Sequence, residues 1–118
     1  VRTMLLPRLF DSVKTSIPVT ISGQNGLIFN PIHSVDVSIA ILKSLALRGS
    51  DCFNLAGNDQ ISIKQICDYF ASYLAVSPVY NFLDGADSFC VSDISKICSF
   101  LHTPSKSIFD NIDDLSLA

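Results

Sequence analysis

The side chains best suited to acid–base chemistry are few in this 118-residue chain and stand far apart in its sequence. A nucleophile–histidine–acid triad would have to use His33, which directly precedes an apolar stretch, or His102. A histidine that directly precedes an apolar helix, as His33 does, usually has a structural role. The Asp113–Asp114 pair is expected on a solvent-exposed surface. Asp84 and Asp87 fall in a loop where they could contact a ligand. The residues themselves therefore predict no catalytic site.

Four cysteines are the remaining candidates for metal binding or redox chemistry. None forms a Cys-x-x-Cys pair, and neither histidine lies close to them in sequence, so a zinc site is not predicted. Two of the cysteines fall on the apolar faces of expected helices, where a free thiol packs as a small hydrophobe. We expect reduced, buried thiols and no metal. The cysteines are Cys52, Cys67, Cys90 and Cys98.

Composition narrows the class of protein. Apolar residues make up 48% of the chain and charged residues 16%, which is typical of a globular chain. The net charge of −3 comes without any run of Lys and Arg, so nucleic-acid binding is not predicted. No apolar run is long enough to cross a membrane and no signal segment is present, so we expect a cytoplasmic protein. The length allows one domain over residues 1–118, and a start at Val1 suggests a fragment of a longer protein.

The chain is organised around the stretch from Phe29 to Leu42, which reads as an extended segment entering an apolar helix. Ser34 is the expected N-cap, and Asp36 suits the positive end of the helix dipole. The helix should span about 35–47 and end before Gly49. Because it is apolar around most of its circumference, it needs a partner surface beyond this chain.

The remaining signals predict a mixed α/β fold, in which a small sheet of short strands packs with about five helices. Residues 18–22 and 27–29 should form a strand pair, a hairpin or a short crossover, around the Asn25–Gly26 turn. A helix opened by Ser62 has the clearest 3.6-residue period. The other expected elements are helices at 3–15 (capped by Thr3), at about 94–101 (capped by Ser92 or Asp93) and at about 107–115, and strands at 52–56 and 78–82.

Five segments in this order resemble the C-terminal, substrate-binding part of an extended short-chain dehydrogenase/reductase, the NAD-dependent epimerase/dehydratase family. Each segment alone is a weak motif, but the ordered set covers almost the whole chain. The matching segments are Leu5-Leu6-Pro7-Arg8-Leu9-Phe10, Pro18-Val19-Thr20-Ile21-Ser22-Gly23, Ile32-His33-Ser34-Val35-Asp36-Val37, Phe53-Asn54-Leu55-Ala56-Gly57 with Ile61-Ser62-Ile63, and Asp93-Ile94-Ser95-Lys96.

The resemblance implies a lobe that confers substrate specificity while an N-terminal Rossmann domain, absent from this chain, binds NAD or NADP and carries a Tyr-x-x-x-Lys pair. Tyr69, Tyr73 and Tyr80 each lack a lysine four residues later. The chain alone would then hold no catalytic residue, no cofactor-binding residue and no cofactor. It would close over a sugar nucleotide in an epimerase, dehydratase or reductase, with polysaccharide biosynthesis as one setting. The full-length protein could be a homodimer, with no nucleic-acid or membrane partner.

By position, six residues match substrate-lining sites of the family. Two of them depart from its pattern, because Phe29 and Leu83 stand where many members place an arginine that pairs with the substrate pyrophosphate. This leaves open two alternatives, a stand-alone non-catalytic binding module on the same fold and a reductase of a small non-nucleotide substrate. The six residues are Leu5, Thr20, Ser22, Phe29, Pro31 and Leu83.

Overall fold

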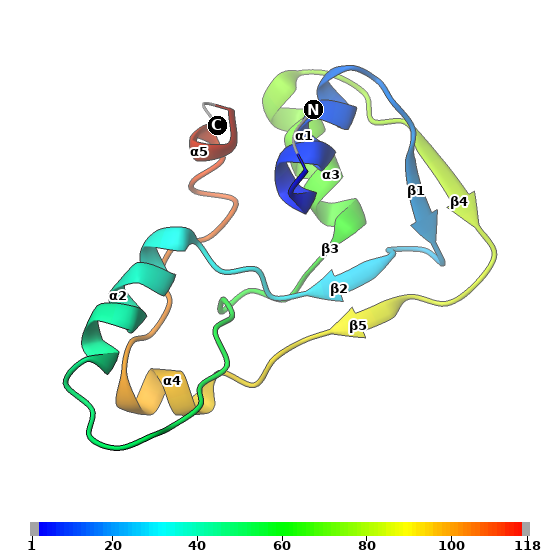
Figure 1. Cartoon of the computed structure of the whole chain (residues 1–118). Helices are drawn as coiled ribbons and strands as arrows, with labels where there is room; N and C mark the ends of the chain where they lie inside the picture. Colours follow the sequence, from blue (N-terminus) through cyan, green and yellow to red (C-terminus); the bar gives the residue numbers. More distant parts are fainter. Residues whose placement is uncertain (1–2, 117–118) are drawn as a thin grey trace.

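The structure is a computed structural model that describes residues 3–116. Its elements confirm the mixed α/β class (Figure 1). The helices are α1 (Leu5–Lys14), α2 (Ser34–Ser44), α3 (Ile63–Leu74), α4 (Ser95–Phe100) and α5 (Asp113–Ser116). The strands are β1 (Val19–Ser22), β2 (Leu27–Phe29), β3 (Ile61–Ser62), β4 (Tyr80–Leu83) and β5 (Ser88–Cys90). None of these helices is long and apolar enough to cross a membrane.

The strands form two small sheets that meet at a bend. β1 pairs with β4 in parallel, and β2 lies between antiparallel β3 and parallel β5. The segment β1–turn–β2 therefore runs alongside β4–loop–β5 through the same corner (Figure 1). The predicted strands at 18–22 and 27–29 exist, but they do not pair as a hairpin. Their parallel partners come from the C-terminal half of the chain, which sequence-local signals do not reveal.

The main core lies between one face of the β1–β4 pair and the helices α1 and α3. Phe10 of α1 meets Phe70 of α3 edge to face, with ring centroids 5.3 Å apart, above the fully buried Ile21 of β1. The start of α3 confirms its prediction. The Ser62 hydroxyl accepts from the Gln65 N–H, and the Gln65 side chain accepts from the Ser62 N–H, forming a capping box.

Three helix caps differ from the predictions. The N-cap of α4 is Ile94, without a side-chain hydrogen bond, and not Ser92 or Asp93. The N-cap of α1 is Met4, without a side-chain hydrogen bond, and not Thr3. At α2 the N-cap is His33, whose Nδ1 accepts from the Val35 N–H at 3.1 Å, so Ser34 is already the first residue of the helix. The His33 imidazole therefore accepts the hydrogen bond from the first turn of α2 that the Ser34 hydroxyl was expected to accept. α2 also ends at Ser44, before Gly49.

Three other segments were assigned wrongly from the sequence. Residues 52–56 have no ladder partner among the described residues and form no strand. Residues 88–90 form β5, although Ser88 was expected to end a loop and no strand was predicted here. The last helix covers only α5, because the preceding residues 107–112 make turns that pack against the core.

The C-terminal segment is fastened to the start of α2 by two histidine–aspartate pairs. The carboxylate of Asp36, which is 1% exposed, accepts from His102 Nε2 at 2.7 Å and from the backbone N–H groups of Ser105 and Lys106. His33 Nε2 lies 2.7 Å from Asp114 Oδ2. Asp36 does occupy the first turn of α2, as predicted, but its strongest partners are in the C-terminal segment.

The shape of the molecule is extended for its length. The radius of gyration is 16.1 Å, whereas a compact domain of this length would have about 13.5 Å. α2, α4 and the segment between α2 and β3 lie to one side of the main core (Figure 1). This part of the chain is consequently less enclosed than the β1–β4 half.

The Asp36 cluster should make the fold sensitive to acid. Burial by itself raises the pKa of this carboxyl, but hydrogen bonds from His102, Lys106 and Ser105 outweigh it and hold the pKa below its usual range. Its stabilising contribution is therefore complete above the unfolded-state pKa, about 3.9, and is lost as the pH falls through the folded-state pKa.

We expect Asp36→Asn to lower the free energy of unfolding by about 3 kcal/mol at pH 7 and to flatten the acid limb of the stability profile. Urea unfolding between pH 3 and 7 measures both effects. Asp110→Asn, at an exposed position, is the control and should stay within about 0.5 kcal/mol of the parent. Equal stabilities for the two variants at pH 7 would contradict the role given to Asp36.

Candidate functional site

The β1–β4 pair has one covered face and one open face. Ile21 points into the core, and its neighbours Thr20 and Ser22 point the other way and are exposed. The parallel register places Asn81 beside Thr20, and Leu83 beside Ser22. The structure thus brings together three of the predicted site residues. It adds Asn81, which only the strand register could have revealed.

The other three predicted residues are spread over the molecule. Leu5 is exposed at the first position of α1. Phe29 of β2 is partly buried against the core cluster, where it has a packing role. Pro31 lines a separate hollow of about 170 Å³ together with Asn58 and Lys106. Only Thr20, Ser22 and Leu83 therefore share a surface.

A larger hollow, the carboxyl-edge hollow, lies where β1 and β4 both end. Its volume is about 760 Å³. The carboxyl ends of parallel strands are the usual ligand-binding edge of a parallel sheet. Gly23 and Leu83 meet there through the Gly23 N–H, which donates to the Leu83 carbonyl at 3.2 Å. The lining residues are Gly23, Gln24, Phe82, Leu83, Asp84, Gly85, Ala86 and Asp87.

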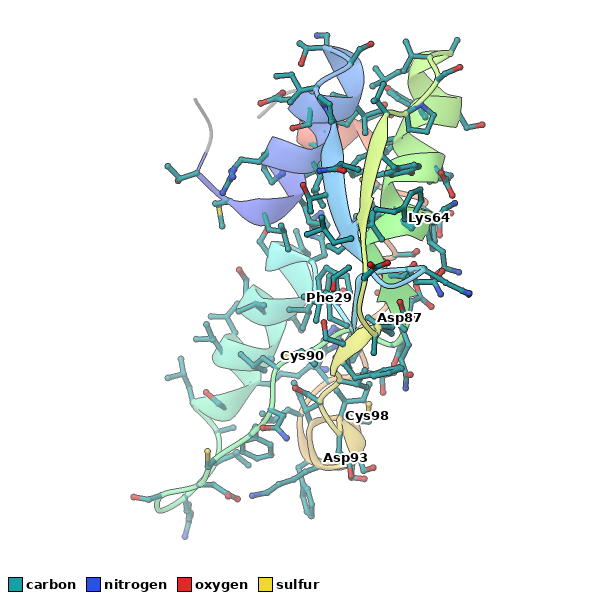
Figure 2. All side chains as sticks on the ribbon, turned by 90° about the vertical axis from the view of Figure 1, so that its right-hand side faces the viewer. Phe29, Lys64, Asp87, Cys90, Asp93 and Cys98 are labelled. Carbon is teal, nitrogen blue, oxygen red and sulfur yellow. The ribbon has the colours of Figure 1, made fainter. Side chains whose placement is uncertain are left out.

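Asp87 holds the two loops of this hollow together. Its Oδ1 accepts from the N–H groups of Gln24 and Asn25 at 2.9 and 2.8 Å, and its Oδ2 accepts from the Asn25 side-chain amide at 3.0 Å. These bonds, led by the Asn25 side chain, hold the pKa of Asp87 below its usual range. Figure 2 shows Asp87 at the bend between β4 and β5, beside the turn that follows β1. Its role is therefore structural.

Asp84, the other loop aspartate singled out from the sequence, is different. Its carboxylate is exposed, lines the carboxyl-edge hollow and has no hydrogen-bond or ion-pair partner among the described residues. The side chains of Thr20, Ser22 and Asn81 are likewise uncommitted within residues 3–116. Together they leave hydrogen-bonding capacity on the open face of β1–β4 and at its edge.

Within residues 3–116, the side chains best suited to acid–base chemistry or metal binding stand apart or are engaged elsewhere. Both histidines are engaged with aspartates in the fastening described above. No group of three His, Cys, Asp or Glu side chains could hold a metal ion in this part of the chain. Cys67 is buried, which raises the pKa of its thiol to about 12, but Cys52 and Cys90 are exposed, so only part of the expectation of buried thiols is met.

The chain's glycines do not fit a dinucleotide. Such a cofactor needs a glycine-rich turn that leads from a strand into a helix. Four of the five glycines have positive φ and lie singly in turns or loops, and the N-caps given for α1 to α4 are Met4, His33, Ser62 and Ile94. No chemical step can therefore be assigned to NAD or NADP on these residues.

Comparison with known proteins defines the fold. Neither a scan of protein-family models nor a search of curated proteins gave a match. Among solved structures, UDP-glucuronic acid 4-epimerase from Bacillus cereus in complex with NAD is 24% identical, with a TM-score of 0.77 over 93% of this chain and 35% of that one. MoeE5 in complex with UDP-glucose and NAD is 18% identical, with a TM-score of 0.78 over 97% of this chain and 41% of that one.

A third similar structure is GDP-mannoheptose C4 reductase from Campylobacter jejuni with NADP bound. It is 15% identical, with a TM-score of 0.72 over 97% of this chain and 46% of that one. The chain thus spans less than half the length of each of these proteins. Its fold matches part of each of these NAD- or NADP-bound structures, and this confirms the fold predicted from the five ordered segments.

Gly23, in the lining of the carboxyl-edge hollow, and Gly49, in the lining of another hollow, provide a matched pair of glycine tests. Gly23 and Gly49 have nearly the same φ, +80° and +78°, but a Cβ at Gly23 would lie 2.6–2.8 Å from atoms of Asp87 and Ala86, whereas a Cβ at Gly49 meets nothing within 4 Å. Both Gly→Ala variants incur the strain of positive φ, about 1 kcal/mol.

We expect Gly49→Ala to stay near that value and Gly23→Ala to cost about 2 kcal/mol more, because the clash displaces the loop that Asp87 holds. Chemical denaturation gives the free energies of unfolding. Amide NMR shifts of residues 84–87 should change only in Gly23→Ala. Similar costs for the two variants would show that the two loops are not in tight contact.

Proposed function

We propose that this chain, as a single domain over residues 1–118, is the substrate-binding and specificity lobe of an NAD(P)-dependent epimerase, dehydratase or reductase acting on a nucleotide sugar. The observation that carries the proposal is the open β1–β4 face, with its uncommitted polar side chains, in a fold whose solved examples are described with UDP-glucose, NAD or NADP. The cofactor and the catalytic residues would belong to a separate N-terminal Rossmann domain, and Thr20, Ser22 and Leu83 would face the substrate.

An apolar surface on α2 supports a second domain. We define the α2 patch as Val35, Ile41, Leu42 and Leu45, of which Leu42 is 67% and Leu45 77% exposed. The opposite side of the helix is buried, at Ala40 and Asp36. A helix that is buried on one side and apolar on the other lacks a covering surface.

The extended segment 52–56 continues this surface. A hollow of about 460 Å³ separates it from α2, with Ile41 and Leu47 on one side and Phe53 and Leu55 on the other. Lys96 holds its start by donating to the Cys52 carbonyl at 2.9 Å. The matched structures are more than twice as long as this chain, so their remaining length can supply such a covering domain. We assign the α2 patch to the N-terminal domain.

If a second domain covers the α2 patch in the complete protein, the isolated chain should leave this patch exposed and bind hydrophobic dyes. We expect ANS fluorescence from the 118-residue chain, and a fall of about half in the variant Leu42→Ser/Leu45→Ser, since these side chains are the most exposed part of the patch. Phe100→Ser, a 68% exposed position outside the patch, is the control and should change the signal little. A dye-inert, monodisperse parent chain would instead favour the stand-alone binding module.

A reductase of a small non-nucleotide substrate is the other candidate. The absence of an arginine at Phe29 and Leu83, and of any basic side chain in the lining of the carboxyl-edge hollow, favours it. Equilibrium dialysis of the complete protein against UDP and dTDP separates the two candidates. The nucleotide-sugar proposal expects retention of at least one of them, and loss of both would support the small substrate.

The setting of the complete protein follows from the same proposal. We place it in the cytoplasm, where nucleotide sugars and NAD(P) are available, as a homodimer formed through its Rossmann domain. Polysaccharide biosynthesis is a reaction sequence that consumes such products.

A further inference from the structure

One edge of β4 carries backbone hydrogen-bonding groups that no other strand pairs. Its sheet contains only β1 and β4, so the far side of β4 is open among residues 3–116, and β4 lies at the margin of the molecule (Figure 1). The carbonyls of Val79 and Leu83 accept hydrogen bonds from N–H groups on the β1 side. Because these groups alternate in direction along a strand, the N–H and C=O groups of Tyr80 and Phe82 point to the open edge.

The side chains of β4 leave this edge without the usual protection. Phe82 is 53% exposed, and its ring centroid lies 5.6 Å from that of Tyr80, on the side of the sheet that faces α3. An edge strand is commonly protected by charged side chains, by a proline or by a covering segment. None of the four residues of β4 is charged or a proline. The open edge is therefore suited to pairing with another strand.

The two ends of the open edge carry complementary groups. At its start, the Lys64 ammonium of α3 lies 5.3 Å from the centre of the Tyr80 ring, and Figure 2 shows Lys64 beside β4. This ammonium donates to Asp68 at 2.8 Å and has further N–H donors to offer. At the other end, directly after Leu83, the Asp84 carboxylate is exposed and has no partner among the described residues.

We propose that β4 pairs with the β4 strand of a second copy of this chain, antiparallel about a two-fold axis at Phe82. A two-fold axis perpendicular to the sheet keeps every side chain on its own face, so residues opposite each other must share a face. Centring the pair on Phe82 uses its outward N–H and C=O groups and brings the two Phe82 rings together. It also places Tyr80, with the Lys64 ammonium beside it, opposite the partner's Asp84.

The complementary ends select this register and this occupant. A pair centred on Asn81 would place Asp84 opposite Pro78, away from the ammonium. An antiparallel copy is the partner that meets Lys64 with Asp84 at both ends of the edge, and aromatic and opposite-charge cross-strand pairs each stabilise an antiparallel pair. The pairing extends the sheet to four strands and leaves its Thr20 face open.

This inference goes beyond the proposed function and does not depend on it. A homodimer through a Rossmann domain and a second two-fold interface at β4 would together give a tetramer of the complete protein. Failure of the β4 interface would leave the dialysis test with UDP and dTDP unaffected.

Charge reversal tests the partner and the register together by sedimentation equilibrium. All chains carry Leu42→Ser/Leu45→Ser, so that the α2 patch contributes no association. We expect this background chain to dimerise. Lys64→Asp or Asp84→Lys should each weaken its self-association about tenfold, because either homodimer then holds two like-charged contacts. An equimolar mixture of the two variants should recover the association, since the mixed dimer again holds two Lys–Asp contacts. Asp110→Lys, at an exposed position outside β4, is the control and should change nothing.

Hydrogen exchange of the same background chain locates the contact. Exchange of the Tyr80 and Phe82 amides should slow as the protein concentration rises, whereas the Asn81 amide, which points to β1, should be protected at every concentration. Amide spectra of the variants verify that they are folded. A monomer at millimolar concentration, a mixture that stays dissociated, or concentration-dependent protection that omits these two amides would overturn the proposal. The edge would then be left to a segment of the complete protein outside this chain.

Discussion

The parallel alignment of two bent segments determines the architecture of this chain. β1 and β2 turn a corner, β4 and β5 turn the same corner beside them, and the carboxylate of Asp87 bonds one bend to the other. A parallel pair needs a long connection between its strands. α2, β3 and α3 occupy that connection, and α3 packs back on the pair to form the core. The hollow at the strand ends is a direct result of this alignment.

The local features were predictable because short-range chemistry determines them. The Ser62 cap, the 3.6-residue period of α3 and the Asn25–Gly26 turn need no information beyond their own segments. The family resemblance, which uses the order of motifs along the whole chain, predicted the overall fold correctly. The resemblance also named Thr20 and Ser22 as substrate-lining positions, and both lie on the open face of the β1–β4 pair.

What sequence reasoning missed depends on contacts between distant residues. β5 is a strand only because β2 offers it an edge, and Asn81 joins the site only through its register with Thr20. Asp36 was interpreted as a partner of the helix dipole, although its strongest bonds come from residues 102–106. Conversely, 52–56 has the composition of a strand but no ladder partner among the described residues.

His33 couples both ends of this fastening through its two ring nitrogens. Because Nδ1 accepts from the Val35 N–H, the imidazole must carry its hydrogen on Nε2, which donates to Asp114. One imidazole therefore serves two elements, because its Nδ1 lone pair caps the first turn of α2 and its Nε2–H binds the last helix of the described chain. Loss of this one side chain would loosen the C-terminal segment and uncap the helix that bears the apolar patch at the same time.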